Sequence, residues 1–280
     1  MSFPEKDFDA PANKSLVDEF GRHHTDLRIS VTDRCNLRCG YCMPLEASFM
    51  SQQRLLTYDE VARCANVASE MGIQTIRLTG GEPLLRPRLY QLIEQLTQLP
   101  KIQEVALTTN GLLLADQAAG LARAGLSRLN VSLDSLDEAR FEKIARRSGL
   151  QRILEGLEEA RRQGFRSIRM NAVSIRGLTE QDIVPLAEFC RTHCFHLRFI
   201  EFMPLDAEDA WSREDVLTGR EVRQIIEMHI GELSQIEGNN PGQPSIDYTY
   251  IDGSGVVGFI NPVSQPFCDR CDRLRLTADG

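Results

Sequence analysis

Short apolar runs alternate with amphipathic segments from about residue 26 onward. The runs are brief, rich in β-branched residues and bounded by turn residues, so they predict strands at Leu27–Thr32, Thr75–Thr79, Glu104–Thr109, Arg128–Asp134, Ser167–Ile175 and Leu197–Met203. Between them, apolar residues recur at helical spacing near 57–71, 88–98, 112–124, 137–163 and 179–193. Strands that alternate with helices favour a parallel sheet with right-handed crossovers. We therefore expect an α/β fold, a partial (β/α)6 barrel of the TIM type.

Helix starts support this pattern. In a capping box, the first residue and the residue three positions later each accept, with their side chains, a hydrogen bond from the backbone amide of the other. We expect capping boxes at Thr57-x-x-Glu60, Thr179-x-x-Asp182 and Thr218-x-x-Glu221.

The pattern changes after Met203. An acidic stretch over 205–217 precedes a helix near 218–229, a Gly/Asn/Pro-rich loop at 238–245 and strand-like runs at 247–252 and 256–263. We expect three parts: a leader or arm (1–24), the barrel (25–204) and a C-terminal α+β extension (205–280) that partly closes the base of the barrel.

Polar residues and glycines gather where each predicted strand ends, among them Thr32, Gly80, Asn110, Ser132 and Glu201. Parallel α/β folds bind ligands at the carboxyl edge of their strands. Because the pattern recurs on all six strands, it predicts one shared site.

Composition narrows the function. The chain has 280 residues, 42% of them hydrophobic, and a net charge of −8, which argues against broad binding to nucleic acid or to an anionic membrane. There is no apolar run of membrane-spanning length, and the polar N-terminus lacks the apolar core of a secretory signal. We expect a cytoplasmic protein.

Seven of the eight cysteines form three groups: Cys35/Cys39/Cys42, Cys190/Cys194 and Cys268/Cys271. Clustered cysteines without a secretory signal indicate metal or redox chemistry rather than disulfides. The first group, C-x3-C-x2-C, supplies three soft ligands, whereas a structural zinc site normally has four. A 4Fe–4S cluster on three thiolates leaves one iron open, and a zinc-binding module is the alternative. For Cys190 and Cys194, packing is favoured over a metal site.

The segment around these cysteines resembles the radical S-adenosylmethionine (SAM) superfamily, which has this spacing, an aromatic residue before the last cysteine (Tyr41) and a GGEP segment (Gly80–Pro83). The resemblance implies that SAM binds the open iron and is cleaved by one electron to methionine and a 5′-deoxyadenosyl radical. Glycine lets a ligand approach the main chain closely. We therefore expect free carbonyls and amides at Gly80–Gly81 to bind the methionine amino group.

Six ordered segments resemble the GTP 3′,8-cyclase family of molybdenum cofactor biosynthesis more specifically: DLRISVTDRCNLRCGYCMP, IRLTGGEPLLR, TTNG, LNVSLDSLD, RFIEFMPL and FCDRCDRLRLTADG. The family makes (8S)-3′,8-cyclo-7,8-dihydroguanosine 5′-triphosphate from GTP. The resemblance implies that Cys35, Cys39 and Cys42 are the ligands of the first cluster. It also implies that the catalytic residues are these three cysteines together with Arg273 and Arg275. It implies SAM contacts by Tyr41 (backbone), Gly81, Ser132 and Met203, and GTP contacts by Arg28, Arg77, Thr108, Arg169, Arg273 and Arg275.

The family also implies a second 4Fe–4S cluster, here on Cys268 and Cys271, that binds GTP at the far mouth of the barrel. Two departures matter. Arg169 stands where the family has lysine, and the family's third C-terminal cysteine would lie beyond Gly280. We therefore expect the chain as given to hold the second cluster poorly or not at all. A peptide maturase with an auxiliary cluster and an inactive fragment remain alternatives.

The same resemblance implies partners. These are GTP, an electron donor such as flavodoxin or ferredoxin, and the next enzyme of the pathway, cyclic pyranopterin monophosphate synthase; a homodimer is left open.

Overall fold

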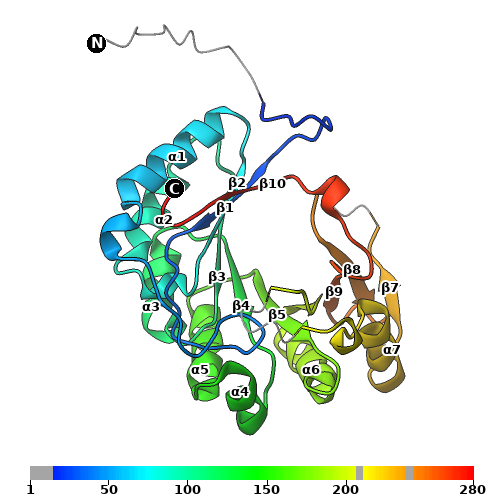
Figure 1. The fold of residues 1–280 in the computed structure, drawn as a ribbon. Helices are drawn as coiled ribbons and strands as arrows, with labels where there is room; N and C mark the ends of the chain where they lie inside the picture. Colours follow the sequence, from blue (N-terminus) through cyan, green and yellow to red (C-terminus); the bar gives the residue numbers. More distant parts are fainter. Residues whose placement is uncertain (1–14, 206–210, 238–241) are drawn as a thin grey trace, which may run out of the picture.

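A curved, unclosed sheet organises the molecule (Figure 1). The computed structural model describes residues 15–205, 211–237 and 242–280. Within these residues, ten strands follow the order β10-β1-β2-β3-β4-β5-β6-β9-β8-β7. The sheet confirms the expected partial barrel.

The first six strands form the barrel wall and are parallel throughout. They are β1 (Asp26–Ser30), β2 (Thr75–Thr79), β3 (Glu104–Thr109), β4 (Arg128–Ser132), β5 (Ile168–Ser174) and β6 (His196–Glu201).

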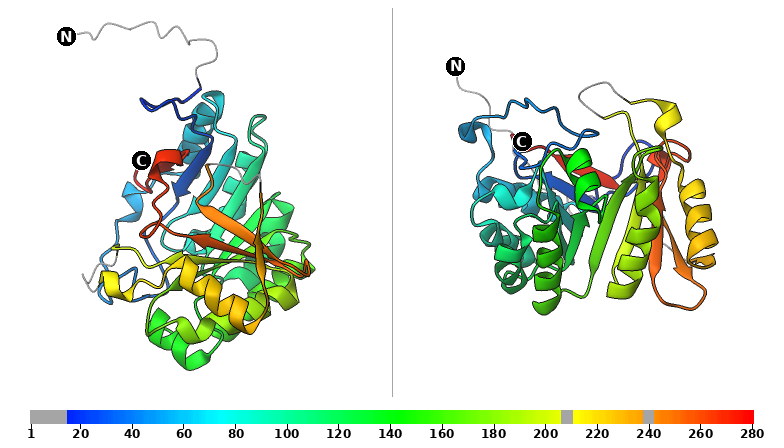
Figure 2. Two further views of the ribbon diagram at one scale, coloured as in Figure 1. Left: turned by 90° about the vertical axis from the view of Figure 1, so that its right-hand side faces the viewer. Right: turned by 90° about the horizontal axis from the view of Figure 1, so that it is seen from below.

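Six helices cover the convex side of this wall, as Figure 1 and the right-hand view of Figure 2 show. They are α1 (Tyr58–Glu70), α2 (Leu89–Thr97), α3 (Leu114–Arg123), α4 (Glu138–Ala145), α5 (Leu150–Arg162) and α6 (Ile183–His193). Apolar strand residues such as Ile29, Ile76 and Leu107 pack with helix residues such as Leu92 and Leu121 in one buried core. Burial of these faces is the main force that holds helices to sheet.

The residues after 205 add strands to both edges of the sheet. They form α7 (Gly219–His229), β7 (Leu233–Gln235), β8 (Ser245–Tyr250), β9 (Val256–Ile260) and β10 (Arg273–Leu276). β9 lies parallel to β6 and begins an antiparallel meander, whereas β10 returns to lie parallel to β1. The proposed division near 204/205 stays a prediction, since both parts share this sheet.

Short 3-10 turns connect several of these elements. They are Gln52–Arg54, Pro83–Leu85, Glu180–Asp182, Arg213–Asp215 and Cys268–Arg270.

Two predicted helical features are wrong. The helix expected over 137–163 is two helices, because Arg146 (φ 55°) and Gly149 (φ 134°) take backbone angles that no helix interior accepts. The capping box at Thr179 is absent, since this residue precedes a 3-10 turn and its side chain caps nothing there. The boxes at Thr57 and Thr218 are confirmed.

Three predicted segments fall partly outside the described residues: 1–14 of the arm, 206–210 of the acidic stretch and 238–241 of the Gly/Asn/Pro-rich loop. Of the helices that the structure describes, none is both long and apolar enough to cross a bilayer.

Candidate functional site

Strand alternation places the predicted site residues on the concave face. In β1, Leu27 and Ile29 are buried toward the helices, so Arg28 points to the opposite side of the sheet. The same alternation in the other strands gives the concave face a polar set: Arg77, Thr108, Arg128, Asn130, Ser132, Arg169, Asn171 and Arg198. The lumen of the partial barrel is thus polar, and its convex side is apolar.

The first three cysteines meet at the carboxyl edge of the strands. Cys35, Cys39 and Cys42 line one cavity of ≈ 340 Å³ together with Gly80 and Gly81. Thr277 and Ala278, which directly follow β10, line the same cavity. The three cysteines thus share one cavity, and sequence reasoning missed the wall formed after β10.

Hydrogen bonds from several elements hold this loop. The amides of Arg38 and Gly40 donate to the carbonyls of Ala145 and Ile144, at the end of α4, over 2.9 and 3.1 Å. The side-chain amide of Asn110, which follows β3, donates to the Cys35 sulfur at 3.8 Å. The loop is therefore shaped by the barrel rather than by a bound group alone.

Tyr41 and Asp134 form a further anchor. The Tyr41 hydroxyl donates to Oδ2 of Asp134 over 2.6 Å, and the amide of Val173 donates to Oδ1 over 2.8 Å. Asp134 follows β4 and is 7% exposed. Burial raises the pKa of this carboxyl to about 6, although both hydrogen bonds favour its ionised form. The cysteine loop is thus tied to β4 and β5 through one buried carboxylate.

The thiols themselves lie in a site that suits a cluster. Burial raises the pKa of Cys35, Cys39 and Cys42, and a nearby acidic residue or thiol adds to each rise. A bound cation would lower these pKa values instead, because metal ions bind cysteine as the deprotonated thiolate. Among the described residues, no three Cys, His, Asp or Glu side chains are placed to hold a single metal ion. A 4Fe–4S cluster takes one thiolate on each of three irons, which is the number of thiols that this loop supplies, whereas a structural zinc ion normally takes four ligands.

The glycine segment packs against the same loop. A Cβ on Gly80 would collide with the Thr32 carbonyl, and one on Gly81 with the Arg34 carbonyl. The expectation of free amides here is wrong for Gly81, whose N–H donates to Thr32 over 2.8 Å. The next residue, Glu82, is 1% exposed and accepts hydrogen bonds from Thr109 and from the amides of Asn110 and Leu84. Glycine is thus required for close packing of two backbones.

Ser132 and Met203 lie outside the lining of the cysteine cavity. Ser132 is the last residue of β4, and Met203 follows β6, so both stand at the same carboxyl edge. Thr108 lies deeper, opposite Asn130 in the β3–β4 register.

Arginines occupy the opposite, amino-terminal part of the lumen. Register places Arg28 of β1 between Arg77 of β2 and Arg275 of β10, and it places Arg273 beside Asp26. A cavity of ≈ 150 Å³ at the amino edge is lined by five arginines and three carboxylates, namely Arg77, Arg128, Arg169, Arg198 and Arg273 with Asp26, Glu104 and Asp272. Sequence reasoning missed Arg128 and Arg198, although each, like Arg28 and Arg77, is a charged residue within a largely apolar strand.

Carboxylates neutralise only some of these arginines. Arg77 pairs with Asp26 at 3.1 Å, Arg128 with Glu104 at 2.6 Å, and Arg198 with Asp247 at 3.3 Å. Within the described residues, Arg28, Arg169 and Arg275 have no such partner, and the Nε atoms of Arg28, Arg77, Arg128 and Arg198 are buried without a hydrogen bond.

This crowding has an electrostatic cost. Burial, followed by repulsion from Arg77 and Arg275, lowers the pKa of Arg28 to about 10. Burial and Arg198 likewise lower the pKa of Arg169 to about 10. Guanidinium groups held together against their mutual repulsion form a site for a multiply charged anion.

The second cysteine pair lies at this amino-terminal mouth. Cys268 begins a 3-10 turn, Cys271 follows it, and β10 begins at Arg273. Because β10 runs parallel to β1, its first residues stand at the amino edge, opposite the first cysteine loop. The Arg273 Nε lies 3.4 Å from the Cys271 sulfur. The two cysteine groups therefore flank the lumen from opposite ends.

Cys190 and Cys194 take no part in this site. The Cys190 thiol is buried 3.4 Å from the Met170 sulfur, and Cys194 is exposed at the end of α6.

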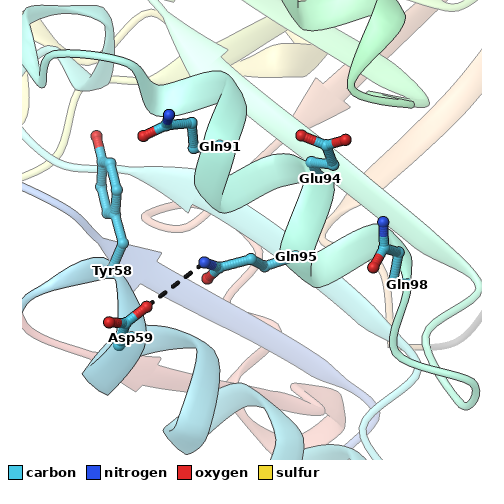
Figure 3. A pocket seen from close by; sticks show the side chains of 6 residues that line it. All are labelled: Tyr58, Asp59, Gln91, Glu94, Gln95 and Gln98. Carbon is cyan, nitrogen blue, oxygen red and sulfur yellow. Dashed lines mark hydrogen bonds between the residues drawn. The ribbon is translucent and has the colours of Figure 1, made fainter.

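A larger hollow on the outer surface is unrelated to this chemistry. It has a volume of ≈ 510 Å³ and lies between α1 and α2, with the Gln95 amide 3.5 Å from Asp59 (Figure 3). Its lining offers amides, carboxylates and a phenol, but neither thiols nor cations: Tyr58, Asp59, Gln91, Glu94, Gln95 and Gln98.

Comparison with known proteins decides the family. Residues 29–190 match the radical SAM superfamily. The chain belongs to this superfamily. Residues 195–280 match the Molybdenum Cofactor Synthesis C family. This range includes the second cysteine pair and both C-terminal arginines.

Curated relatives narrow the family further. A GTP 3′,8-cyclase of Rhodopirellula baltica is 48% identical over 270 residues, which cover 95% of this chain and 75% of that protein. Molybdenum cofactor biosynthesis protein 1 of Drosophila melanogaster is 42% identical over 269 residues, or 96% of this chain and 47% of that protein. Within the radical SAM superfamily, the chain thus belongs to the GTP 3′,8-cyclase family.

Solved structures support the fold. Streptococcus suis SuiB bound to S-adenosylmethionine superposes with a TM-score of 0.63 at 19% identity, covering 74% of this chain and 48% of that one. Methylornithine synthase (PylB) gives 0.57 at 16% identity, covering 75% of this chain and 63% of that one. The chain spans about half the length of SuiB.

For this radical SAM protein, family membership implies a 4Fe–4S cluster and SAM, and the cyclase relatives imply a second cluster. The donor set at the carboxyl edge, three thiols on one cavity, is the set that the first cluster requires.

Proposed function

We propose that this chain is a GTP 3′,8-cyclase, a radical SAM lyase that converts GTP to (8S)-3′,8-cyclo-7,8-dihydroguanosine 5′-triphosphate in molybdenum cofactor biosynthesis. The observation that carries the proposal is the division of one lumen between thiols at its carboxyl edge and arginines without carboxylate partners toward its amino edge. A nucleoside triphosphate can span such a lumen, with phosphates on the arginines and ribose toward the thiols.

At the carboxyl edge, Cys35, Cys39 and Cys42 would hold the cluster. When bound, the cluster and SAM would supply one-electron chemistry, in which a hydrogen atom of the ribose is transferred to the 5′-deoxyadenosyl radical released from SAM. We assign the SAM contacts to the Tyr41 backbone, Gly81, Ser132 and Met203. The position of these residues at one edge of the sheet supports that assignment.

In the lumen, Arg28, Arg77, Arg169, Arg273 and Arg275 would bind the triphosphate, and Thr108 would contact GTP nearer the middle. Arg28, Arg169 and Arg275 are the strongest of these candidates, because Arg77 already pairs with Asp26 and Arg273 faces Cys271. Arginine binds phosphate oxygens in pairs, so Arg169 can replace the lysine of the family with a changed direction of contact. The protein's part in the reaction is to fix the substrate and keep water out.

At the amino edge, Cys268 and Cys271 would supply two ligands of the second cluster. A third ligand must come from another residue, since these two thiols alone leave a cluster incompletely held.

Partners and cellular context extend the same proposal. One-electron chemistry requires a donor, for which a flavodoxin or ferredoxin is suited, and the cyclised triphosphate requires the next enzyme, cyclic pyranopterin monophosphate synthase. We place the reaction in the cytoplasm, and we retain the division into arm, barrel and extension.

The decisive experiment is an anaerobic assay of the reconstituted protein with SAM, a reductant and GTP. We expect 5′-deoxyadenosine and the cyclised nucleotide in equal amounts. The Arg275→Ala variant should weaken GTP binding and leave SAM cleavage uncoupled from cyclisation, whereas Arg123→Ala, at an exposed site on α3, should change neither. SAM cleavage that is the same with and without GTP and that yields no cyclised nucleotide would refute the proposal.

A further inference from the structure

A tight turn precedes β1 and lies against the second cysteine loop. Val17 and His23 form an isolated antiparallel bridge. Inside it, the amide of Asp18 donates to the Arg22 carbonyl over 3.1 Å, and the amide of Gly21 donates to the Asp18 carbonyl over 3.0 Å. Gly21 adopts φ +76°, a left-handed angle that glycine accepts without strain. Residues 17–23 thus form a closed turn, which we call the N-terminal turn.

Asp18 holds Arg22 in a fixed direction within this turn. Its Oδ1 accepts from the amides of Phe20 and Arg22 over 2.9 and 3.0 Å, and its Oδ2 accepts from the Arg22 Nε over 2.6 Å. The centre of the Phe20 ring lies 5.2 Å from the guanidinium carbon. Two residues of the turn, Asp18 and Phe20, therefore contact the guanidinium before it reaches any other part of the protein.

The free end of that guanidinium reaches the second cysteine loop. Arg22 Nη1 donates to the carbonyl of Cys268. Three residues later, the Thr25 hydroxyl donates to Oδ2 of Asp272 over 2.9 Å, and the Thr25 amide donates to the Asp272 carbonyl over 3.2 Å. The segment from Cys268 to Asp272, which contains both thiols, is thus fastened at each end to residues just before β1.

This segment has little burial of its own to hold it. Cys268, Asp269 and Arg270 are exposed, and their 3-10 turn is three residues long. Where apolar contact is small, a hydrogen bond from a charged donor contributes a large share of the local stability. The segment leads directly into β10, where Arg273 and Arg275 stand beside Asp26 and Arg28.

We propose that the N-terminal turn acts as a clasp in which Arg22 is a positioning residue. The clasp fixes Cys268 and Cys271 relative to the arginines of β1 and β10. The identity of the ligands, a cluster and a nucleoside triphosphate, rests on the proposed function; the clasp itself does not. Without it, only the contacts of Thr25 with Asp272 and the pairing of β10 with β1 would hold this segment. The Cys268 end would then move, and its sulfur would lose its fixed distance from Arg28, Arg273 and Arg275.

The test compares Arg22→Gln with Arg123→Gln, a matched change at an exposed position on α3. In metal-free protein, amides of residues 267–275 should exchange with deuterium about tenfold faster in Arg22→Gln, the change that loss of one hydrogen bond from a charged group brings. Amides of residues 35–43 should exchange as in the wild type, and Arg123→Gln should match the wild type in both segments. Asp18→Asn, which leaves Arg22 present but less firmly oriented, should give a smaller rise in the same segment.

Unchanged exchange over 267–275 in Arg22→Gln would overturn the proposal. Faster exchange throughout the protein in both Arg22→Gln and Asp18→Asn would also overturn it, because the turn would then support the whole fold rather than this loop. In reconstituted protein, Arg22→Gln should bind GTP about tenfold more weakly while SAM binding is unchanged. Failure of the wild type to bind GTP would refute the proposed function, yet the exchange comparison would still decide the clasp.

Discussion

Arg77, Arg28 and Arg275 lie side by side on adjacent strands and form a row of arginines. We predict that removing one charge from this row will stabilise the fold and weaken binding of the substrate. Arg28 lies between Arg77 and Arg275, without a carboxylate partner among the described residues. The drop of its pKa from the ordinary value to about 10 corresponds to about 3 kcal/mol of unfavourable free energy for the charged form. Partial exposure screens part of this, so we expect Arg28→Met to raise the free energy of unfolding by about 1–3 kcal/mol.

The neighbouring residue provides the control. Arg77→Met removes the same charge from the same row, but it also leaves Asp26 without its partner at 3.1 Å. Breaking a largely buried ion pair destabilises a protein, so this variant should lose about 1–3 kcal/mol. Both changes should weaken binding of GTP about tenfold or more, because each removes a charge-assisted contact to phosphate.

The assay is urea unfolding of metal-free protein under anaerobic conditions, with and without inorganic triphosphate. Inorganic triphosphate should stabilise the wild type more than Arg28→Met, since an anion that binds only the folded state shifts unfolding in proportion to its affinity. If Arg28→Met were less stable than the wild type and responded equally to triphosphate, Arg28 would be a structural residue and the electrostatic reasoning would be wrong.

Three more predictions test other parts of the molecule. Cys39→Ala should abolish SAM cleavage, and normal 5′-deoxyadenosine formation by this variant would contradict the cluster assignment. Asp134→Asn keeps an acceptor for the Val173 amide, and its side-chain NH2 can donate to the Tyr41 oxygen, which reverses that hydrogen bond. Because the folded-state pKa of Asp134 is raised to about 6, the wild type should lose up to about 3 kcal/mol of stability relative to this variant as the pH rises from about 4 through 6. A stability difference in urea unfolding that does not change with pH would contradict this reasoning. Gly81→Ala should cost about 3 kcal/mol or more, because its Cβ would collide with the Arg34 carbonyl; unchanged thermal unfolding would show that the two backbones can separate freely.

The barrel strands were predictable because each depends on local pattern. The family resemblance named Arg28 and Arg77, and the alternation of polar and apolar residues in β1 and β2 puts both on the lumen face, where the register makes them neighbours. The same pattern also contained Arg128 and Arg198, which sequence reasoning passed over because no family motif drew attention to them.

Features that depend on distant contacts were not predictable. β10 is a strand because it pairs with β1, and only that pairing brings Arg275 beside Arg28. Nothing in residues 137–163 shows that α4 must end where its last carbonyls bind the cysteine loop, although Arg146 and Gly149 mark the break once it is known. Tertiary contact determines such elements, and propensity only permits them.

The position of β10 has a consequence for assembly. Thr25 and Asp272 are 247 residues apart in sequence, yet they bond directly, and the residues after β10 line the first cysteine cavity. Contacts of such long range are slow to form, since the intervening chain must be ordered first. During synthesis, a nascent chain that already carries its first three thiols would still leave them open to solvent and oxygen along one side. The barrel thus gains its protection only when β10 has returned to pair with β1.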